Sequence, residues 1–179
     1  MILTLNQLEE ACPYTPYKRL ELILPNLNAT LEKYEINNYF RISHFLAQVF
    51  VESNYLRLIQ EPGIGFNYEG SIELGNTQHG DGRRFIGRGY LQLRGRKQYK
   101  EYKKASNIDV LMYPHYVTMP TAAMDVAGWI WNEKKLNLLA DQDDLEGITK
   151  LLTGTYTMLR EREDALHKIK KAVGVISVK

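Results

Sequence analysis

Apolar side chains recur at helical spacing along much of the chain, and the most regular stretch begins at Arg41. Residues three and four positions apart lie on the same face of an α-helix, so this recurrence predicts an amphipathic helix. Glu52 falls about 80° from the centre of the apolar stripe at about 100° per residue, which places it between core and solvent. The stripe is formed by Ile42, Phe45, Leu46, Val49 and Leu56.

The first forty residues carry shorter helical patterns. Thr4 and Gln7 have the spacing of a capping box, in which each side chain accepts a hydrogen bond from the other residue's backbone N–H. Thr15 and Pro16 can open a second helix, because proline fits the first helical turn. We expect this second helix to end at the residue before Pro25.

Helical patterns return in the last third of the chain. Pro120 suits the first turn of a helix, and apolar residues follow it on one face. Further helices are predicted, one capped by Asp143 or Asp144 and one over residues 161–173. The apolar face after the proline is formed by Ala123, Val126, Ala127 and Ile130.

Residues 62–99 separate these helical regions and differ from both, because glycine is frequent and helical periodicity is absent. Within them only residues 90–93 alternate between polar and apolar side chains, as a short strand does. A chain of 179 residues is long enough for one domain with a sizeable core. The sequence therefore predicts a single, mainly α-helical domain over residues 1–179, with residues 62–99 as a small loop or hairpin lobe.

Composition excludes several classes of protein. The single cysteine, Cys12, cannot form an intramolecular disulfide. No N-terminal secretion signal and no apolar run of about 18 residues is present, so we expect no inserted membrane span and no export instruction. The formal charge of +2 suits an acidic partner without selecting one. We expect no metal or other cofactor, because the histidines lack the spacing of metal ligands: His44, His79, His115 and His167.

Glu52 and Glu61 are placed so that they can face each other across a cleft. In a continuous helix they would point apart, because nine residues amount to roughly half a turn of net rotation. Pro62 disfavours helical geometry at the residue before it and glycines follow, so Glu61 lies at a turn where the chain can fold back. Two such carboxyl groups, about 6.5–9.5 Å apart, are what an inverting glycosidase requires.

The surroundings of the two glutamates suggest different roles. Apolar neighbours disfavour the charged form of Glu52, which suits a general acid. Glu61, beside glycines at a turn, can stay solvated and ionised, which suits a base that activates water. Glu69 and Glu73 lie on the same glycine-rich stretch and are alternatives for the base. Composition alone would favour the interpretation that both glutamates are ordinary surface charges, so a catalytic role for the pair needs support from sequence motifs.

Five sequence blocks accompany these glutamates: LTLNQLEEACP (3–13), HFLAQVFVES (44–53), FNYEG (66–70), GDGRRFIGRGYLQLRGRKQY (80–99) and AGWIWNEKKLNLLADQDDLEGITKLLTG (127–154). In order and spacing they resemble the phage-lysin and bacterial branch of the chitinase-like glycoside hydrolase family 19. The resemblance covers nearly the whole chain. It implies a mainly α-helical, lysozyme-like fold with a cleft, and inverting cleavage of β-1,4 links in chitin or in the peptidoglycan glycan strand.

The resemblance also implies roles for single residues. Glu52 matches the general acid of the family, and Glu61 matches its second glutamate. Gln92 would be a sugar-binding residue, and Arg162 in the motif RER would be a charged partner in the cleft. The candidate substrate-binding residues are Tyr90, Gln92, Arg94, Gln98, Thr153 and Arg162.

The chain departs from the family pattern at three cleft positions. Arg94 stands where a serine or threonine commonly holds the attacking water, and Gln98 stands where an asparagine precedes the tyrosine. Thr153 replaces the asparagine of the motif NGG. These changes indicate altered substrate contacts or a differently held water. Our hypothesis is that the hydroxyl of Thr153 or Thr155 replaces the missing one.

Residues 83–104 are rich in lysine and arginine, with aromatic residues between them. In isolation, this composition is typical of a surface that binds single-stranded nucleic acid. Sugar rings also pack on aromatic faces, and peptidoglycan carries carboxylates that attract cations, so we favour the wall polymer. The aromatic residues are Phe85, Tyr90, Tyr99 and Tyr102.

The sequence thus predicts a glycosidase that acts on peptidoglycan glycan strands and binds no nucleic acid. A small enzyme without a signal peptide or wall-binding module fits a monomeric phage endolysin, which is cytolytic and antimicrobial. Such an enzyme is made in the host bacterial cytoplasm, released by a holin, and acts in the periplasm and cell wall. The alternatives are a chitinase, a catalytically silent saccharide- or nucleic-acid-binding protein, and a toxin delivered into a competing cell. The bond that is cut, after N-acetylmuramic acid or after N-acetylglucosamine, stays open at this point.

Overall fold

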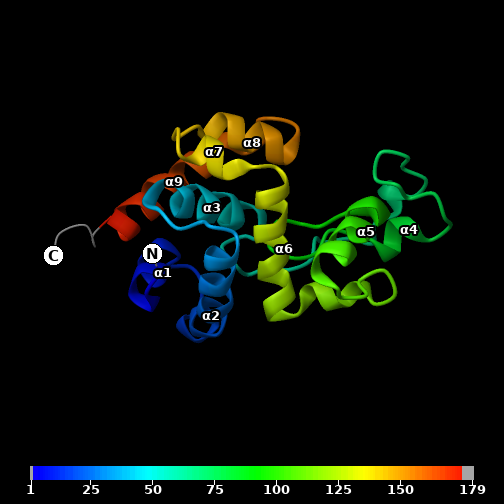
Figure 1. Ribbon diagram of the computed structural model, residues 1–179, viewed down its shortest axis with the longest axis horizontal. Coiled ribbons are helices and arrows are strands. Elements are labelled where there is room, and N and C mark those ends of the chain that lie inside the picture. The colour runs from blue at the N-terminus through cyan, green and yellow to red at the C-terminus, as the bar shows by residue number, and fades with distance from the viewer. Residues whose placement is uncertain (1, 175–179) are drawn as a thin grey trace.

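The computed structural model describes residues 2–174, which form a helical body and a lobe that projects from it (Figure 1). Helix α6 runs along the boundary, and the green segments beyond it make up the lobe. The α-helices are α1 (Leu5–Ala11), α2 (Tyr17–Lys33), α3 (Tyr39–Glu52), α4 (Asp81–Arg84), α5 (Gly95–Ser106), α6 (Pro120–Glu133), α7 (Leu136–Ala140), α8 (Leu145–Thr153) and α9 (Leu159–Gly174), and the 3-10 helices are η1 (Phe66–Tyr68) and η2 (Pro114–Thr118).

Helix α3 is the central element of the body. It begins behind Asn38, whose side chain accepts a hydrogen bond from the backbone N–H of Arg41 (2.9 Å). Helix α9 packs along α3 and also against α1, while α2 packs against α6. Every residue from Ile42 to Phe50 is buried, which fixes α3 from several directions at once.

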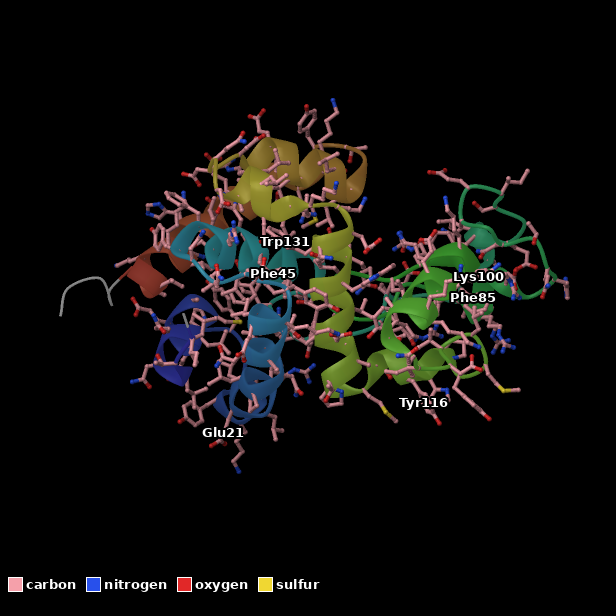
Figure 2. The ribbon with its side chains drawn as sticks, viewed as in Figure 1. Glu21, Phe45, Phe85, Lys100, Tyr116 and Trp131 are labelled. Carbon is pink, nitrogen blue, oxygen red and sulfur yellow. The ribbon has the colours of Figure 1, made fainter. Side chains whose placement is uncertain are left out.

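Aromatic pairs mark the core in both parts of the molecule, and Figure 2 labels three of their members, Phe45, Trp131 and Phe85. In the body, the rings of Phe45 and Trp131 meet edge to face with centroids 5.4 Å apart. In the lobe, the rings of Phe85 and Tyr99 lie 5.0 Å apart. Both pairs belong to one contiguous cluster of buried side chains. Among residues 2–174, no helix combines the length and the apolar character that crossing a membrane requires.

Several predicted helix starts are confirmed. Thr4 and Gln7 form the complete capping box at the start of α1. Pro120 occupies the first turn of α6, where its missing N–H is not needed. Asp144 caps α8, because its carboxylate accepts a hydrogen bond from the N–H of Gly147 (2.8 Å).

The prediction that the second helix ends before Pro25 is wrong. Helix α2 continues through Pro25 to Lys33. A proline inside a helix removes one hydrogen bond and costs about 3 kcal/mol. Leu27 and Leu31 beyond it are buried, and each fully buried leucine contributes about 1.5–3 kcal/mol, so tertiary packing offsets the cost.

Helix α3 ends at Glu52, so Leu56 does not extend its apolar stripe as predicted. Asn54, Tyr55 and Leu56 all adopt left-handed backbone conformations, with φ of 49°, 56° and 63°. The hydroxyl of Ser53 stabilises this turn by accepting a hydrogen bond from the N–H of Leu56 (2.9 Å). Leu56 therefore enters the core from the turn, and Glu52 is left at the end of the helix.

The expected hairpin in the lobe is reduced to one tight loop. Two backbone hydrogen bonds between Arg88 and Leu93, of 2.7 and 3.1 Å, close the loop. Gly89 and Gln92 have positive φ, of 78° and 55°, which bends residues 90–93 too sharply for a strand. Within residues 2–174, only isolated bridges form, and no regular strand does.

Helix α5 was not expected from the sequence. Most of its residues are charged or polar, and the large side chains that it buries are Tyr99 and Tyr102. Two apolar positions give too weak a periodicity to predict a helix. Asn107, in the left-handed conformation, ends α5 in the position where helices commonly stop.

Candidate active site

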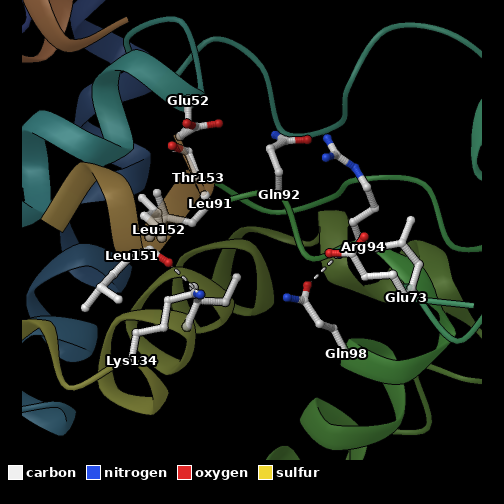
Figure 3. Close-up of a pocket in the computed structure, with 13 residues that line it drawn as sticks. Glu52, Glu73, Leu91, Gln92, Arg94, Gln98, Lys134, Leu151, Leu152 and Thr153 are labelled. Carbon is white, nitrogen blue, oxygen red and sulfur yellow. Dashed lines mark hydrogen bonds between the residues drawn. The ribbon is translucent and has the colours of Figure 1, made fainter. Parts of the chain in front are cut away.

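A cleft of about 430 Å³ separates the body from the lobe (Figure 3). Three body helices end at this cleft: α3 with Glu52, α6 with Lys134 directly after it, and α8 with Thr153. The opposite wall belongs to the lobe. Its polar side chains are Glu73, Gln92, Arg94 and Gln98.

Glu52 combines access to the cleft with a fixed cationic partner. Its side chain is 26% exposed, and one of its oxygens accepts a hydrogen bond from Arg162 of α9, whose side chain is 1% exposed. The sequence predicted apolar surroundings for Glu52. The structure places a buried guanidinium group beside it as well, which the helical pattern could not reveal. Arg162 was predicted to be a charged, substrate-binding partner in the cleft, but its side chain does not line the cleft and contacts Glu52 instead.

Gln48 completes the support of Glu52 and was missed at the sequence level. Its carbonyl oxygen accepts a hydrogen bond from Arg162 (2.5 Å), and its amide donates to the hydroxyl of Thr149 (3.3 Å). Gln48 is fully buried one helical turn before Glu52. The available signal was that Gln48, four positions before the glutamate, is the one polar residue between Phe45 and Val51.

Glu61 does not itself line the cleft, so the predicted arrangement in which it faces Glu52 across the cleft is not seen, and three neighbours hold its carboxylate. The N–H of Gly87 donates to Oε1 (2.5 Å), and the hydroxyl of Tyr68 donates to Oε2 (2.9 Å). Arg94 donates from Nη2 to Oε2 (2.5 Å) and from Nε to Oε1 (3.3 Å). The backbone N–H of Glu61 in turn donates to the carbonyl of Gly87 (3.0 Å).

These contacts decide the charge of Glu61. Burial alone would raise its pKa, but the Gly87 N–H, the Arg94 guanidinium and the Tyr68 hydroxyl together hold the pKa below its ordinary value. The carboxylate is therefore ionised at neutral pH. The expectation that solvent keeps it charged is wrong, since the side chain is only 13% exposed and protein donors replace water.

The two alternative bases differ in their surroundings. Glu69 accepts hydrogen bonds from the N–H groups of Gly80 (2.6 Å) and Gly82 (2.8 Å), so it stabilises the turn into α4. Glu73 is exposed on the cleft wall and has no hydrogen bond or ion pair within the described residues. Across residues 2–174, no group of three or more His, Cys, Asp or Glu side chains is arranged to hold a metal ion.

The polar residues predicted on the lobe wall do line the cleft. Gln92 donates through its amide to the carbonyl of Gly89 (3.0 Å), while its own side-chain oxygen is buried and has no hydrogen-bond partner among residues 2–174. Gln98 accepts a hydrogen bond from the backbone N–H of Arg94 (3.0 Å). This contact fixes the start of α5 and hence the direction from which Arg94 approaches Glu61.

Thr153 lines the cleft, but its hydroxyl is engaged with the backbone. Its oxygen lies 2.9 Å from the carbonyl oxygen of Thr149 and 2.8 Å from that of Thr155, and accepts a hydrogen bond from the N–H of Thr155. The hydroxyl of Thr155 contacts that of Thr157 (2.5 Å). Both hydroxyls proposed to hold a water therefore stabilise the end of α8 and the loop after it.

The aromatic residues among the cations of the lobe are not available for stacking. Tyr90, a predicted substrate-binding residue, is 3% exposed and does not line the cleft. Two of the cations are neutralised, Arg94 by Glu61 and Arg96 by Asp81. The remaining rings, all fully buried, are Phe85, Tyr99 and Tyr102.

No protein-family model matches the chain, but solved structures share its fold. Chitinase C from Streptomyces griseus is 18% identical with a TM-score of 0.78, and the match covers 96% of this chain and 92% of that one. A bacterial family 19 chitinase is 17% identical with a TM-score of 0.79, covering 97% and 96%. The class IV family 19 chitinase from Zea mays is 17% identical with a TM-score of 0.69, covering 86% and 80%. The chain therefore has the mainly α-helical, lysozyme-like fold of the family 19 chitinases.

Proposed function

We propose that the protein is a glycosidase that hydrolyses β-1,4 bonds of the peptidoglycan glycan strand, with Glu52 as general acid and Glu61 as general base. The observation that carries the proposal is the setting of Glu52. A partly exposed carboxyl group at a cleft, whose position is fixed by a buried guanidinium, can meet a bound glycan in a defined orientation, as a general acid must. The fold is shared with structures described as chitinases, which supports glycosidic chemistry.

Glu52 would donate its proton to the oxygen of the leaving sugar. Arg162 holds one carboxyl oxygen, and the other accepts no hydrogen bond within the described residues, which leaves it available for this transfer. After the transfer, the guanidinium stabilises the carboxylate that forms. Gln48 holds Arg162 from its far side, so the cation cannot turn away from Glu52.

Glu61 would accept the proton of a water that attacks the opposite face of the sugar. An ionised carboxylate is required for this step, and the contacts of Glu61 keep it ionised. Attack opposite the leaving group inverts the configuration at the anomeric carbon. Glu73 lies on the lobe wall and is exposed to the cleft, so it is the alternative base.

One unpaired cation in the cleft supports peptidoglycan rather than a neutral glycan as the substrate. This cation, Lys134, lies on the body wall, whereas on the lobe wall Arg94 is paired with Glu61 and Glu73 is an exposed carboxylate. Lys134 donates to the carbonyl of Leu151 (2.8 Å) and has no carboxylate partner among the described residues. Peptidoglycan carries carboxylates on its stems, and chitin does not, so an uncompensated cation fits the former.

The biological role that we propose is that of a phage endolysin, acting as a monomer. It would be synthesised in the host cytoplasm, pass to the periplasm and cell wall with the help of a holin, and lyse the cell. A toxin delivered into a competing bacterium would use the same chemistry by another route. A chitinase is the second candidate function, because the solved structures that share the fold are described as chitinases.

Two substrates test the proposed function: outer-membrane-stripped Gram-negative sacculi and soluble N-acetylglucosamine hexamers. We expect loss of sacculus turbidity, glycan fragments whose new reducing-end sugar identifies the bond, and slower cleavage of the hexamer. Nuclear magnetic resonance of fresh products should show the inverted α-anomer first. If the hexamer is cleaved while the sacculi stay intact, the result would instead support a chitinase. If the protein binds sacculi but releases no fragments, the result would support a catalytically silent binding protein.

Gly87→Ala is expected to lower kcat/KM on glycan strands about a hundred-fold, since misplacement of a reacting group by about 1 Å has an effect of this size. A methyl group on Gly87 would lie 2.7 Å from Oε1 of Gln92 and 3.0 Å from Cδ of Glu61, so both side chains must shift. Gly174→Ala is the control, because its nearest contact, a ring carbon of Tyr39 at 3.4 Å, is ordinary. Unchanged kcat/KM in Gly87→Ala would show that the position of Glu61 is not critical.

A further inference from the structure

The contacts of Glu61 leave it no free acceptor position. A carboxylate has about four lone-pair positions. In Glu61 these accept from the Gly87 N–H, from the Tyr68 hydroxyl and twice from Arg94. A water molecule could not transfer its proton to Glu61 in this arrangement, so one donor must leave first.

Of the three donors, Arg94 is the one whose side chain lines the cleft, so a bound glycan can reach it. The Gly87 N–H is part of the backbone, and the same peptide segment accepts a hydrogen bond from the backbone of Glu61. The Arg94 side chain is 35% exposed and lines the cleft, whereas Glu61 behind it is 13% exposed. Its guanidinium lies over the ring of Tyr68, 4.8 Å from the centroid, a surface along which a planar cation can slide. Arg94 therefore stands between the cleft and Glu61.

Moving Arg94 without replacing its partner is unfavourable, because it separates an ion pair whose carboxylate is mostly buried. An incoming carboxylate or phosphate compensates, since guanidinium binds such planar or tetrahedral anions through two parallel hydrogen bonds. A neutral sugar offers only hydroxyl and amide groups. The state of Glu61 thus depends on whether the bound glycan carries an anionic group near Arg94.

We propose that Arg94 determines the substrate class: a carboxylate on the glycan draws its guanidinium away from Glu61 and so frees Glu61 to accept the proton of the attacking water. This inference rests on the proposed function and specifies why a carboxylated glycan is preferred. Loss of the Arg94 contact also removes one of the interactions that lower the pKa of Glu61, which makes the freed carboxylate a stronger base.

The test compares one polymer in two charge states. Glycan strands with free carboxylates and the same strands amidated with carbodiimide and ammonia are given to the native protein and to Arg94→Ala. We expect kcat/KM of the native protein to be at least ten-fold higher on the carboxylated strands. In Arg94→Ala this ratio should fall to about one, through a higher kcat on amidated strands and a higher KM on carboxylated strands.

Two further variants make the result specific. Lys97→Ala removes an exposed neighbouring cation and should keep the ten-fold ratio. Arg94→Lys keeps the charge but not the paired donors and should give an intermediate ratio, which also covers the case that Arg94→Ala does not fold.

The outcomes separate this inference from the proposed function. If the native protein cleaves carboxylated and amidated strands equally well, the proposed function stands and the role of Arg94 is refuted. If it cleaves neither polymer, the proposed function itself fails, and the inference fails with it. An unchanged ratio in folded Arg94→Ala also overturns the inference.

Discussion

Glu52→Gln is expected to lower kcat on glycan strands about a thousand-fold, within the 10²–10⁴-fold range of general acids. Glutamine has the shape of glutamate but carries no acidic proton for the leaving oxygen. Its amide oxygen can still accept from Arg162, so the fold is retained. A charge-assisted hydrogen bond becomes a neutral one, and we expect the free energy of unfolding to fall by about 1 kcal/mol.

The measurement is steady-state release of reducing ends, together with thermal unfolding followed by circular dichroism. Glu10→Gln is the matched control, because Glu10 is exposed on α1 and has no ion pair within the described residues. It should keep the native kcat. If Glu52→Gln retained more than about a tenth of the native kcat, a general-acid role for Glu52 could not be upheld.

Arg162→Met is expected to reduce both stability and activity. Breaking a buried ion pair costs about 3–5 kcal/mol, and the partial exposure of Glu52 reduces this to about 2–3 kcal/mol because water can hydrate the freed carboxylate. Gln48 loses its donor inside the core, which adds an unsatisfied acceptor. We expect kcat to fall as well, because the carboxylate formed on Glu52 loses its stabilising cation.

Urea unfolding measures the loss of stability in Arg162→Met. The control is Arg160→Met on the same helix. Arg160 is exposed, so its replacement should change the free energy of unfolding by less than about 0.5 kcal/mol. The double variant Arg162→Met with Glu52→Gln should be more stable than the sum of the single effects predicts, since no charge is then left without its partner. Additive effects would show that the two residues do not stabilise each other.

The sequence predicted the body of the fold better than the lobe, for a physical reason. Helices α3 and α6 are buried on nearly all sides, so apolar residues fill most of their positions and include the predicted helical stripes. Helix α5 buries two tyrosines and exposes its charges, and the loop at residues 90–93 depends on positive φ at Gln92. Helix α2 continues through Pro25 only because of what packs beyond it, which local sequence does not encode.

The candidate site, like the fold, was predicted only in part from the sequence. The motif resemblance indicated Glu52, Glu61 and Arg162, and the structure pairs Glu52 with Arg162. It did not indicate that Arg94 would bind Glu61, because the two residues are 33 positions apart and meet only when the lobe folds. Such long-range pairs are fixed by tertiary structure, so no local pattern of polar and apolar residues reveals them.

The contact between Glu52 and Arg162 joins two helices whose contacting residues are 110 positions apart in the chain. A chain that stops before α9 contains Glu52 but lacks the guanidinium that holds it and the helix that covers α3. During translation, the pair of Glu52 and Arg162 would therefore form only after α9 has left the ribosome. The order of synthesis thus delays completion of the proposed catalytic site until the core is closed, and proteolytic removal of α9 would remove the site and the fold together.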